Sequence, residues 1–214
     1  MTDFDRYVLV DVETSGADPA ADRILSIAAL TITPNGAIGR TLHTLLNPGV
    51  EPGPTHIHGI TAPMLAGQPR YAQIAPTLAE LLRGRTLVAH NAAFDYAFLS
   101  AEARRSHTRL PVDSVLCTLE LAKQLRLGLA SHSLAALARH WDIAQHAPHD
   151  ALDDALVLAA VFGRMRTRAG QLGVMLPRRS PRTLAPPTFR PASSMGPNRG
   201  RTTDAEALTR TTDR

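Results

Sequence analysis

Two carboxylates stand near the end of an apolar run close to the N-terminus. Asp11 and Glu13 lie two positions apart in the run YVLVDVE, which the turn-forming triplet TSG ends. Side chains two apart on a strand point to the same face, so these carboxylates lie side by side. Like charges on an apolar strand are poorly solvated, and a bound divalent cation is one remedy. The alternative is that both simply face water on a half-buried strand.

Two further acidic positions lie at the starts of predicted helices. Asp95 closes the segment HNAAFD, directly after a short buried strand, where the helix dipole alone would favour an acid. Asp150 is the expected N-cap of a later helix, and either Asp153 or Asp154 in its first turn could join the first two acids. The residues alone do not choose between them.

His149 precedes that later helix and can reach over its first turn. An imidazole that titrates near neutrality beside carboxylates is a candidate general base. A competing interpretation is a zinc site formed by His140, His146, His149 and Asp150. The spacing of its last two histidines fits zinc, but no firm third ligand or supporting group accompanies them.

The elements that must position these side chains alternate between strands and helices. Apolar patterning predicts strands over residues 7–13, 24–33, 39–46 and 86–90, the first three forming an antiparallel meander. It predicts helices over residues 74–82, 94–105, 116–125, 133–140 and 150–166. Strands first and helices between the later strands indicate an α/β domain with a mixed sheet.

Composition separates a body from a tail. With 44% hydrophobic residues, the 214-residue chain has enough apolar material for a core. From Arg178 onward there are eight arginines against three acidic residues, which leaves the body close to neutral. Residues 177–214 are rich in proline, arginine and small polar residues, so we expect a disordered or flexible tail there.

The remaining composition narrows the class of protein. No apolar run approaches the roughly 20 residues that cross a bilayer, and the acidic N-terminus does not resemble a signal peptide. The single cysteine, Cys117, excludes an internal disulfide and any zinc site built on several cysteines. We therefore expect a cytoplasmic protein without a membrane partner.

Taken together, the three acidic clusters resemble the motifs of the DnaQ-like DEDDh 3′–5′ exonucleases, the family of the proofreading epsilon subunit of bacterial DNA polymerase III. The resemblance runs from about residue 7 to 165 and rests on VDVETSG at 10–16, HNAAFD at 90–95, and His149 followed five positions later by Asp154. Of the two acids in the first turn of the last predicted helix, the resemblance selects Asp154 and leaves Asp153 as a bystander. The loop segment HGIT at 58–61 is also similar to the family.

The resemblance implies a fold, a chemistry and a set of roles. The fold would be an RNase H-like α/β exonuclease domain over residues 5–170, a mixed central sheet flanked by helices, with a flexible tail at 177–214. Two Mg²⁺ or Mn²⁺ ions would be held by four acids, and His149 would take a proton from the attacking water. The four acids are Asp11, Glu13, Asp95 and Asp154.

It also implies a substrate and partners. The substrate would be a single-stranded or frayed 3′ end, with DNA favoured over RNA. Thr14, His58 and Phe94 would contact it. Thr14 has an alternative role as a turn residue, and Phe94 has one as a core residue. Trimming of RNA or short oligoribonucleotides is the alternative activity, and a non-catalytic docking module is the alternative class. The C-terminal region would be the place for a polymerase or sliding clamp, and residues 171–176 faintly resemble a clamp-binding peptide. Gly53 departs from the epsilon pattern, which has a carboxylate there.

Overall fold

A computed structural model describes residues 6–33 and 36–184 of the chain. Its centre is a six-stranded sheet with the order β3-β2-β1-β4-β5-β6. The strands are β1 (Tyr7–Thr14), β2 (Ile24–Ile32), β3 (Ile38–Leu45), β4 (Thr86–Ala89), β5 (Ser114–Cys117) and β6 (Arg178–Arg179). β1 pairs antiparallel with β2 and parallel with β4, so the sheet is mixed as predicted.

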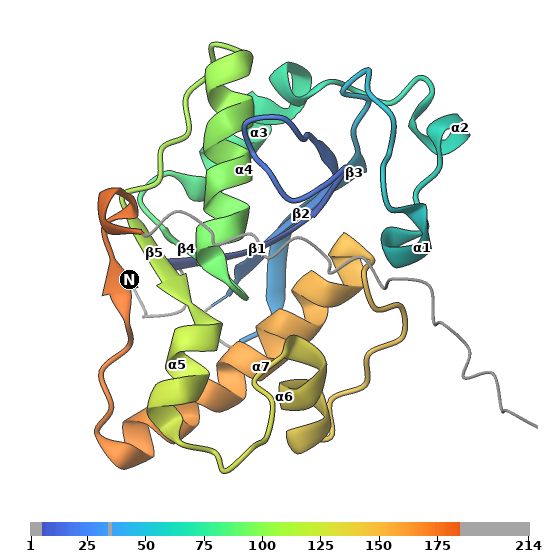
Figure 1. Ribbon diagram of the computed structural model, residues 1–214. Helices are drawn as coiled ribbons and strands as arrows, with labels where there is room; N and C mark the ends of the chain where they lie inside the picture. Colours follow the sequence, from blue (N-terminus) through green and yellow to red (C-terminus); the bar gives the residue numbers. More distant parts are fainter. Residues whose placement is uncertain (1–5, 34–35, 185–214) are drawn as a thin grey trace, which may run out of the picture.

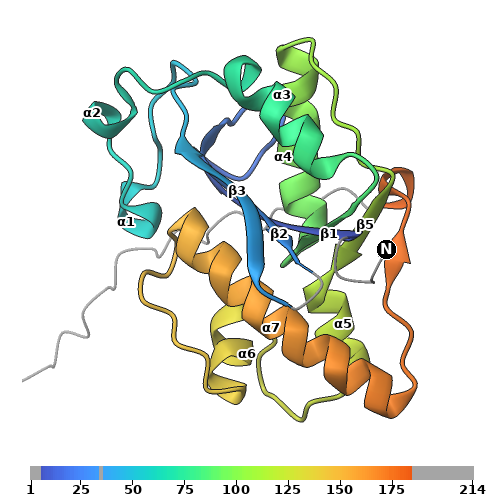
Figure 2. The ribbon, with the colours of Figure 1, turned by 180° about the vertical axis from the view of Figure 1, so that it is seen from behind.

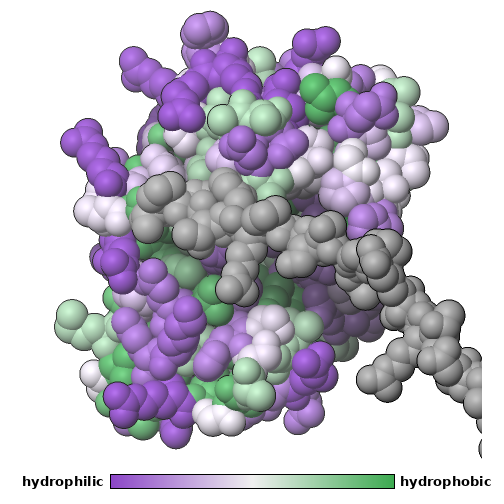
Figure 3. All heavy atoms as spheres, viewed as in Figure 1, coloured by the Kyte–Doolittle hydropathy of each residue, from purple (hydrophilic) through white to green (hydrophobic). Residues whose placement is uncertain are grey.

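Helices cover both faces of the sheet (Figures 1 and 2). α3 and α4 pack on one face, and α5, α6 and α7 pack on the other, each layer with its own apolar cluster. The helices are α1 (Thr55–His58), α2 (Ala62–Leu65), α3 (Tyr71–Leu82), α4 (Ala92–Arg105), α5 (Thr118–Leu125), α6 (Leu134–His140) and α7 (Ala151–Leu172). Hydrophilic residues form much of the outer surface of both helical layers, and hydrophobic residues show between them (Figure 3).

The alternation of side chains along β1 decides which layer each residue meets. Val8 and Val10 lie in the cluster under α3 and α4, whereas Tyr7 and Leu9 lie in the cluster under α5, α6 and α7. Because this alternation has a period of two, Asp11 and Glu13 continue the row of Tyr7 and Leu9. The sequence therefore directs both carboxylates to the face that α7 covers.

The pairing of β1 leaves its second half open on one side. β2 accompanies β1 from Val8 to Thr14, but β4 pairs only with residues 7–9 of β1. Asp11 and Glu13 therefore lie beyond the end of the parallel β1–β4 pair. Ligands of open α/β sheets bind at the carboxyl ends of such strands.

The predicted helices and strands are largely confirmed, although several boundaries differ and strand β5 was not predicted. Residues 116–117, predicted as the start of a helix, complete strand β5, which pairs in parallel with β4. The strand passes into α5 at Thr118 without an intervening turn residue, so apolar periodicity cannot separate the two elements. α7 also runs further than predicted, to Leu172, and ends at Gly173 in the left-handed conformation.

The first residues of the predicted tail differ from the prediction. Arg178 and Arg179 form β6, antiparallel to β5, and Pro181–Thr183 form a 3₁₀ turn. The unpaired outer edge of β5 supplies the backbone partners that the tail's own composition lacks. The remainder of the predicted tail, residues 185–214, lies outside the described residues. In the part of the chain that the structure describes, no helix has the length and apolar character needed to cross a membrane.

Candidate active site

β1 contributes two half-buried acids, Asp11 and Glu13, on the α7 side of the sheet. Burial is the main cause that raises the pKa of the Asp11 carboxyl well above its usual range, and the charges of Asp95, Asp154 and Glu13 add to it. The pKa of Glu13 is raised to about 8, again chiefly by burial and then by Asp154 and Asp95. These shifts show that the acids of the three sequence motifs lie close enough to repel one another.

α4 contributes Asp95 from its first turn. The helix begins after Asn91, which has a positive φ of 70°. Only 4% of Asp95 is exposed, and its carboxylate has a backbone hydrogen bond with Val12, the residue between Asp11 and Glu13. Burial raises the pKa of Asp95 to about 8 despite that hydrogen bond.

α7 contributes Asp154, and the loop before it contributes His149. Asp150 caps the helix by accepting hydrogen bonds from the backbone amides of Leu152 and Asp153. Asp154, 8% exposed, faces inward, and its Oδ2 accepts a hydrogen bond of 3.2 Å from the backbone amide of His149. Burial is the main cause that raises the pKa of Asp154.

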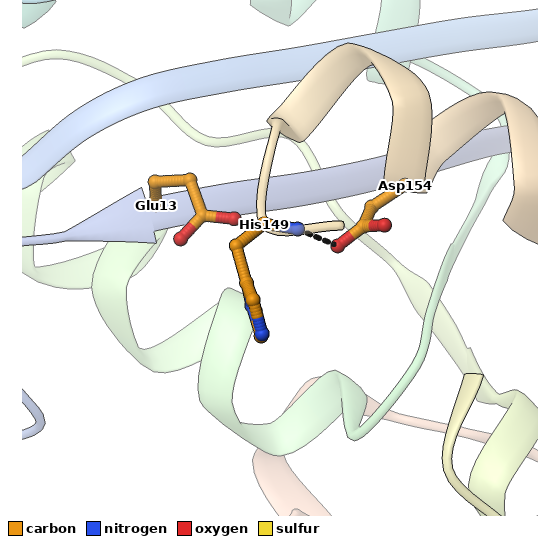
Figure 4. A group of neighbouring side chains, drawn as sticks. All are labelled: Glu13, His149 and Asp154. Atoms are coloured by element: carbon orange, nitrogen blue, oxygen red, sulfur yellow. Dashed lines mark hydrogen bonds between the residues drawn. The ribbon is translucent and has the colours of Figure 1, made fainter. Parts of the chain in front are cut away.

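Glu13, His149 and Asp154 form a group whose ligand atoms all lie within 4.8 Å of one another (Figure 4). Figure 4 shows the imidazole of His149 extending away from the hydrogen bond that its backbone makes with Asp154. Within residues 6–33 and 36–184 this is the one cluster of three or more such side chains. The zinc alternative is therefore not supported, because His140 and His146 do not join His149 and Asp150 in a ligand group.

The donor set fits a divalent cation. Among the described residues, no arginine or lysine forms an ion pair with any of the four acids, and each acid has a raised pKa. Carboxylate oxygens are hard ligands, and a bound cation would offset the mutual repulsion that raises these pKa values. The exonuclease family that the sequence motifs resemble depends on divalent metal ions.

The three residues predicted to contact the substrate differ in which of their side-chain atoms are left for a ligand. The Thr14 hydroxyl donates to the Gly16 carbonyl at 2.6 Å, so it shapes the turn after β1. Both ring nitrogens of His58 are engaged within their own loop, with the Pro52 carbonyl and the Ile60 amide. Phe94 is partly buried and its ring packs on Phe98 at 4.8 Å between centroids. For His58 and Phe94, ring faces rather than polar atoms are left for a ligand.

Gly53 and Gln145 add contacts that the sequence motifs do not contain. A Cβ at Gly53 would meet the Ser15 carbonyl oxygen at 1.9 Å, so only glycine lets this loop lie against the turn after β1. Gln145 donates from Nε2 to Oδ1 of Asp154 at 2.6 Å. Its position in an irregular loop carries no signal that sequence patterns detect.

The exonuclease family model matches residues 8–162. The chain belongs to the DnaQ-like 3′–5′ exonuclease family. It is similar to a putative bifunctional exonuclease/endonuclease protein of Mycobacterium tuberculosis, with 36% identity over 78% of this chain and 27% of that protein. It is also similar to the DNA polymerase III subunit epsilon of Treponema pallidum, with 35% identity over 74% of this chain and 75% of that subunit.

A solved structure supports the same assignment. Exonuclease X in complex with 5′ overhanging duplex DNA superimposes with a TM-score of 0.63 and 27% identity, over 77% of this chain and 93% of that one. The predicted RNase H-like fold and exonuclease family are thus confirmed. The present chain spans only 27% of the length of the Mycobacterium relative, although it covers most of the Treponema subunit.

Proposed function

We propose that the chain hydrolyses the last phosphodiester of a single-stranded or frayed DNA 3′ end and releases a 5′-nucleoside monophosphate. The observation that carries the proposal is the convergence of four buried or half-buried acids with His149 at the open end of β1. A protein that only binds a partner would have no need of these acids, because burying them without a cation costs free energy.

Mg²⁺ or Mn²⁺ fits this donor set better than zinc, because every proposed ligand is a hard carboxylate. Asp11, Glu13 and Asp154 would hold one ion, and Asp11 and Asp95 would hold a second. When bound, such ions stabilise the attacking and leaving oxygens of an in-line displacement at phosphorus.

His149 is the proposed general base. It is exposed, so water has access to it, and its ligand nitrogen lies within 4.8 Å of the carboxylate oxygens of Glu13 and Asp154. The imidazole takes the proton of the water that attacks phosphorus, and the 3′ oxygen of the penultimate nucleotide leaves. The ring faces of Phe94 and His58 would stack against or contact the terminal nucleotide, beside the turn that Thr14 shapes.

A pocket beside the start of α4 supports a nucleic acid substrate. Its volume is about 240 Å³, and Asn91, Ala93 and Lys123 line it together with Glu120 and Arg179, which form an ion pair at 3.0 Å. The pocket lies beside the start of α4, the helix that also carries Asp95, and Lys123 is its basic side chain without an acidic partner in the lining. Phosphate contacts of this kind are independent of base sequence.

DNA is favoured over RNA because relatives with this domain include a DNA polymerase III subunit and an exonuclease solved with DNA. We infer a role in proofreading or repair in the cytoplasm, with residues 5–170 as the nuclease. A polymerase is the proposed protein partner. A sliding clamp is less well supported, because Val174 and Leu176 of the candidate peptide pack against the body.

A gel time course with matched 5′-labelled DNA and RNA single strands tests the proposal. We expect a ladder that shortens from the 3′ end in Mg²⁺ or Mn²⁺ and not in EDTA, with DNA cleaved faster. The Asp11→Asn variant is the control for a contaminating nuclease. Faster cleavage of RNA would favour the trimming alternative, and no cleavage of either strand by folded protein would overturn the enzymatic proposal.

A further inference from the structure

The loop between α6 and α7 carries His149 and has no regular secondary structure of its own over residues 145–149. A single carboxylate oxygen fastens its middle. Oδ2 of Asp153 accepts hydrogen bonds from the backbone amides of His146 at 3.0 Å and Ala147 at 2.9 Å. Asp153 lies in the first turn of α7, so these bonds tie the loop to a long, well-packed helix.

A further backbone hydrogen bond extends this constraint to His149. The carbonyl of Ala147 accepts from the amide of Asp150 at 3.0 Å, which closes a turn around residues 148 and 149. His149 has a φ of +67°, a conformation that a residue with a side chain adopts only when its surroundings hold it there. The direction of its imidazole therefore depends on where the backbone of residues 146 and 147 is fixed.

The three acids at the start of α7 have separate partners. Asp150 accepts from the amides of Leu152 and Asp153 and so caps the helix. Asp154 accepts from Gln145 and from the amide of His149, and it belongs to the group with Glu13. Among the described residues, the carboxylate of Asp153 accepts hydrogen bonds only from the loop, and it lies outside that ligand group.

We propose that Asp153 is a positioning residue that acts on the reaction through His149, by fixing the loop that carries the general base. This inference rests on the proposed function. It replaces the expectation that Asp153 is a bystander, and it assigns the role to an oxygen acceptor rather than to a negative charge. One oxygen accepts both amides, so an asparagine side-chain carbonyl can do the same.

The test compares Asp153→Ala with Asp153→Asn in single-turnover cleavage of a single-stranded DNA in Mg²⁺. We expect Asp153→Ala to lower the rate of the chemical step roughly 10- to 100-fold, the scale of a misplaced catalytic group, with little change in substrate affinity. Asp153→Asn should recover most of that loss. Equal losses in the two variants would overturn the acceptor role.

A double-mutant cycle with His149→Ala separates positioning from a general loss of structure. If Asp153 acts through His149, adding Asp153→Ala to His149→Ala should produce no further loss in rate. An additional loss of about tenfold would show that Asp153 acts elsewhere and would overturn the proposal. Assays are run well below the unfolding temperature of each variant, so that destabilisation does not enter the rates.

Amide hydrogen exchange supplies a measurement that does not depend on activity. Asp153→Ala should speed exchange at the amides of His146 and Ala147, and Asp153→Asn should keep most of their protection. Unchanged protection in Asp153→Ala would overturn the inference. If instead the unmodified chain cleaves no DNA while these exchange changes appear, the proposed function fails and the loop contact stands.

Discussion

Two acids on one face of α4 are both buried, and their surroundings differ completely. Asp95 and Glu102 lie seven residues apart, about two helical turns, with 4% and 1% of each residue exposed. Glu102 accepts from Nε and Nη2 of Arg23 at 2.6 and 2.9 Å, and Arg105 approaches it at 3.5 Å. Among the described residues Asp95 has only backbone hydrogen bonds, and its charge raises the pKa values of Asp11 and Glu13.

The difference separates a scaffold from a site. Glu102 and its two arginines hold the loop after β1, because Arg105 also donates to the carbonyls of Pro19 and Ala20 at 2.7 Å each. A buried acid whose cation is part of the chain is satisfied in the folded protein alone. The acids around Asp95 have no such cation among the described residues, and under the proposed function a divalent cation from solution fills that role.

Replacing Asp11 with asparagine tests the difference between scaffold and site at one of the acids near Asp95. We expect Asp11→Asn to lower the rate of DNA cleavage roughly 10³-fold, because it removes a proposed cation ligand without changing the side-chain volume. In EDTA the same change should raise the free energy of unfolding by about 1 kcal/mol, since one of several repelling charges is gone. Cleavage assays and urea titrations in EDTA measure the two effects.

Opposite signs of the two effects are the decisive outcome for Asp11. A variant that is both inactive and less stable would indicate an ordinary core role for the residue. Thermal shift with added Mn²⁺ provides a check, because a ligand that binds only the folded state raises its stability. The unmodified chain should respond to Mn²⁺ more strongly than Asp11→Asn does.

Replacing Glu102 with glutamine should have the reverse pattern. Removing one partner of a buried ion pair leaves the others uncompensated, and the 24% exposure of the Arg23 side chain reduces the penalty below that of a fully buried pair. We expect a loss of about 2 kcal/mol in the free energy of unfolding, with Mn²⁺ affinity nearly unchanged. Urea denaturation and calorimetric titration measure these quantities.

The exposed pair of Arg40 and Glu80 is the matched control for Glu102. Both side chains are more than half exposed, at 59% and 60%, and their contact is 3.1 Å. Glu80→Gln should change the free energy of unfolding by less than about 0.5 kcal/mol, because water screens such pairs. A loss as large as that of Glu102→Gln would contradict the difference between buried and exposed pairs.

Much of this arrangement was predictable from the sequence. The alternation in β1 placed Asp11 and Glu13 on one face. That prediction rests on local periodicity, which the packed sheet preserves. The family resemblance added Asp95 to the site, and it supplied Asp154 where the residues alone left two choices.

Contacts made by irregular segments could not be predicted in the same way. Gln145 reaches Asp154 only because the loop before α7 folds back, and the Glu102 cluster joins residues 79 positions apart. No periodicity links such residues, since their meeting depends on the path of loops. β5 was missed for a related reason: a four-residue strand runs into a helix with no turn between them.

The pH dependence of stability sharpens the comparison with an expected effect smaller than that of Glu102→Gln. The pKa values of Glu13 and Asp95 are raised to about 8, mainly by burial, so the folded chain binds protons that the unfolded chain has already lost. Their contribution to stability is complete below the unfolded pKa values and is lost as pH rises through about 8. In EDTA, the free energy of unfolding should therefore be about 1 kcal/mol higher at pH 6.5 than at pH 8.

The comparison is confined to pH 6.5 and above, because below pH 6.5 the titration of His90 changes the free energy of unfolding in the opposite direction. Burial lowers the pKa of His90 to about 4, so its contribution is lost as pH falls from 6.5 toward 4. Saturating Mg²⁺ should reverse the trend between pH 6.5 and 8, because cation binding requires the charged carboxylates and strengthens as they ionise. Urea titrations at the two pH values, with EDTA and with Mg²⁺, measure the difference. A slope unaffected by Mg²⁺ would mean that the protons bind somewhere other than at the four acids, and the distinction between Asp95 and Glu102 would lose its physical basis.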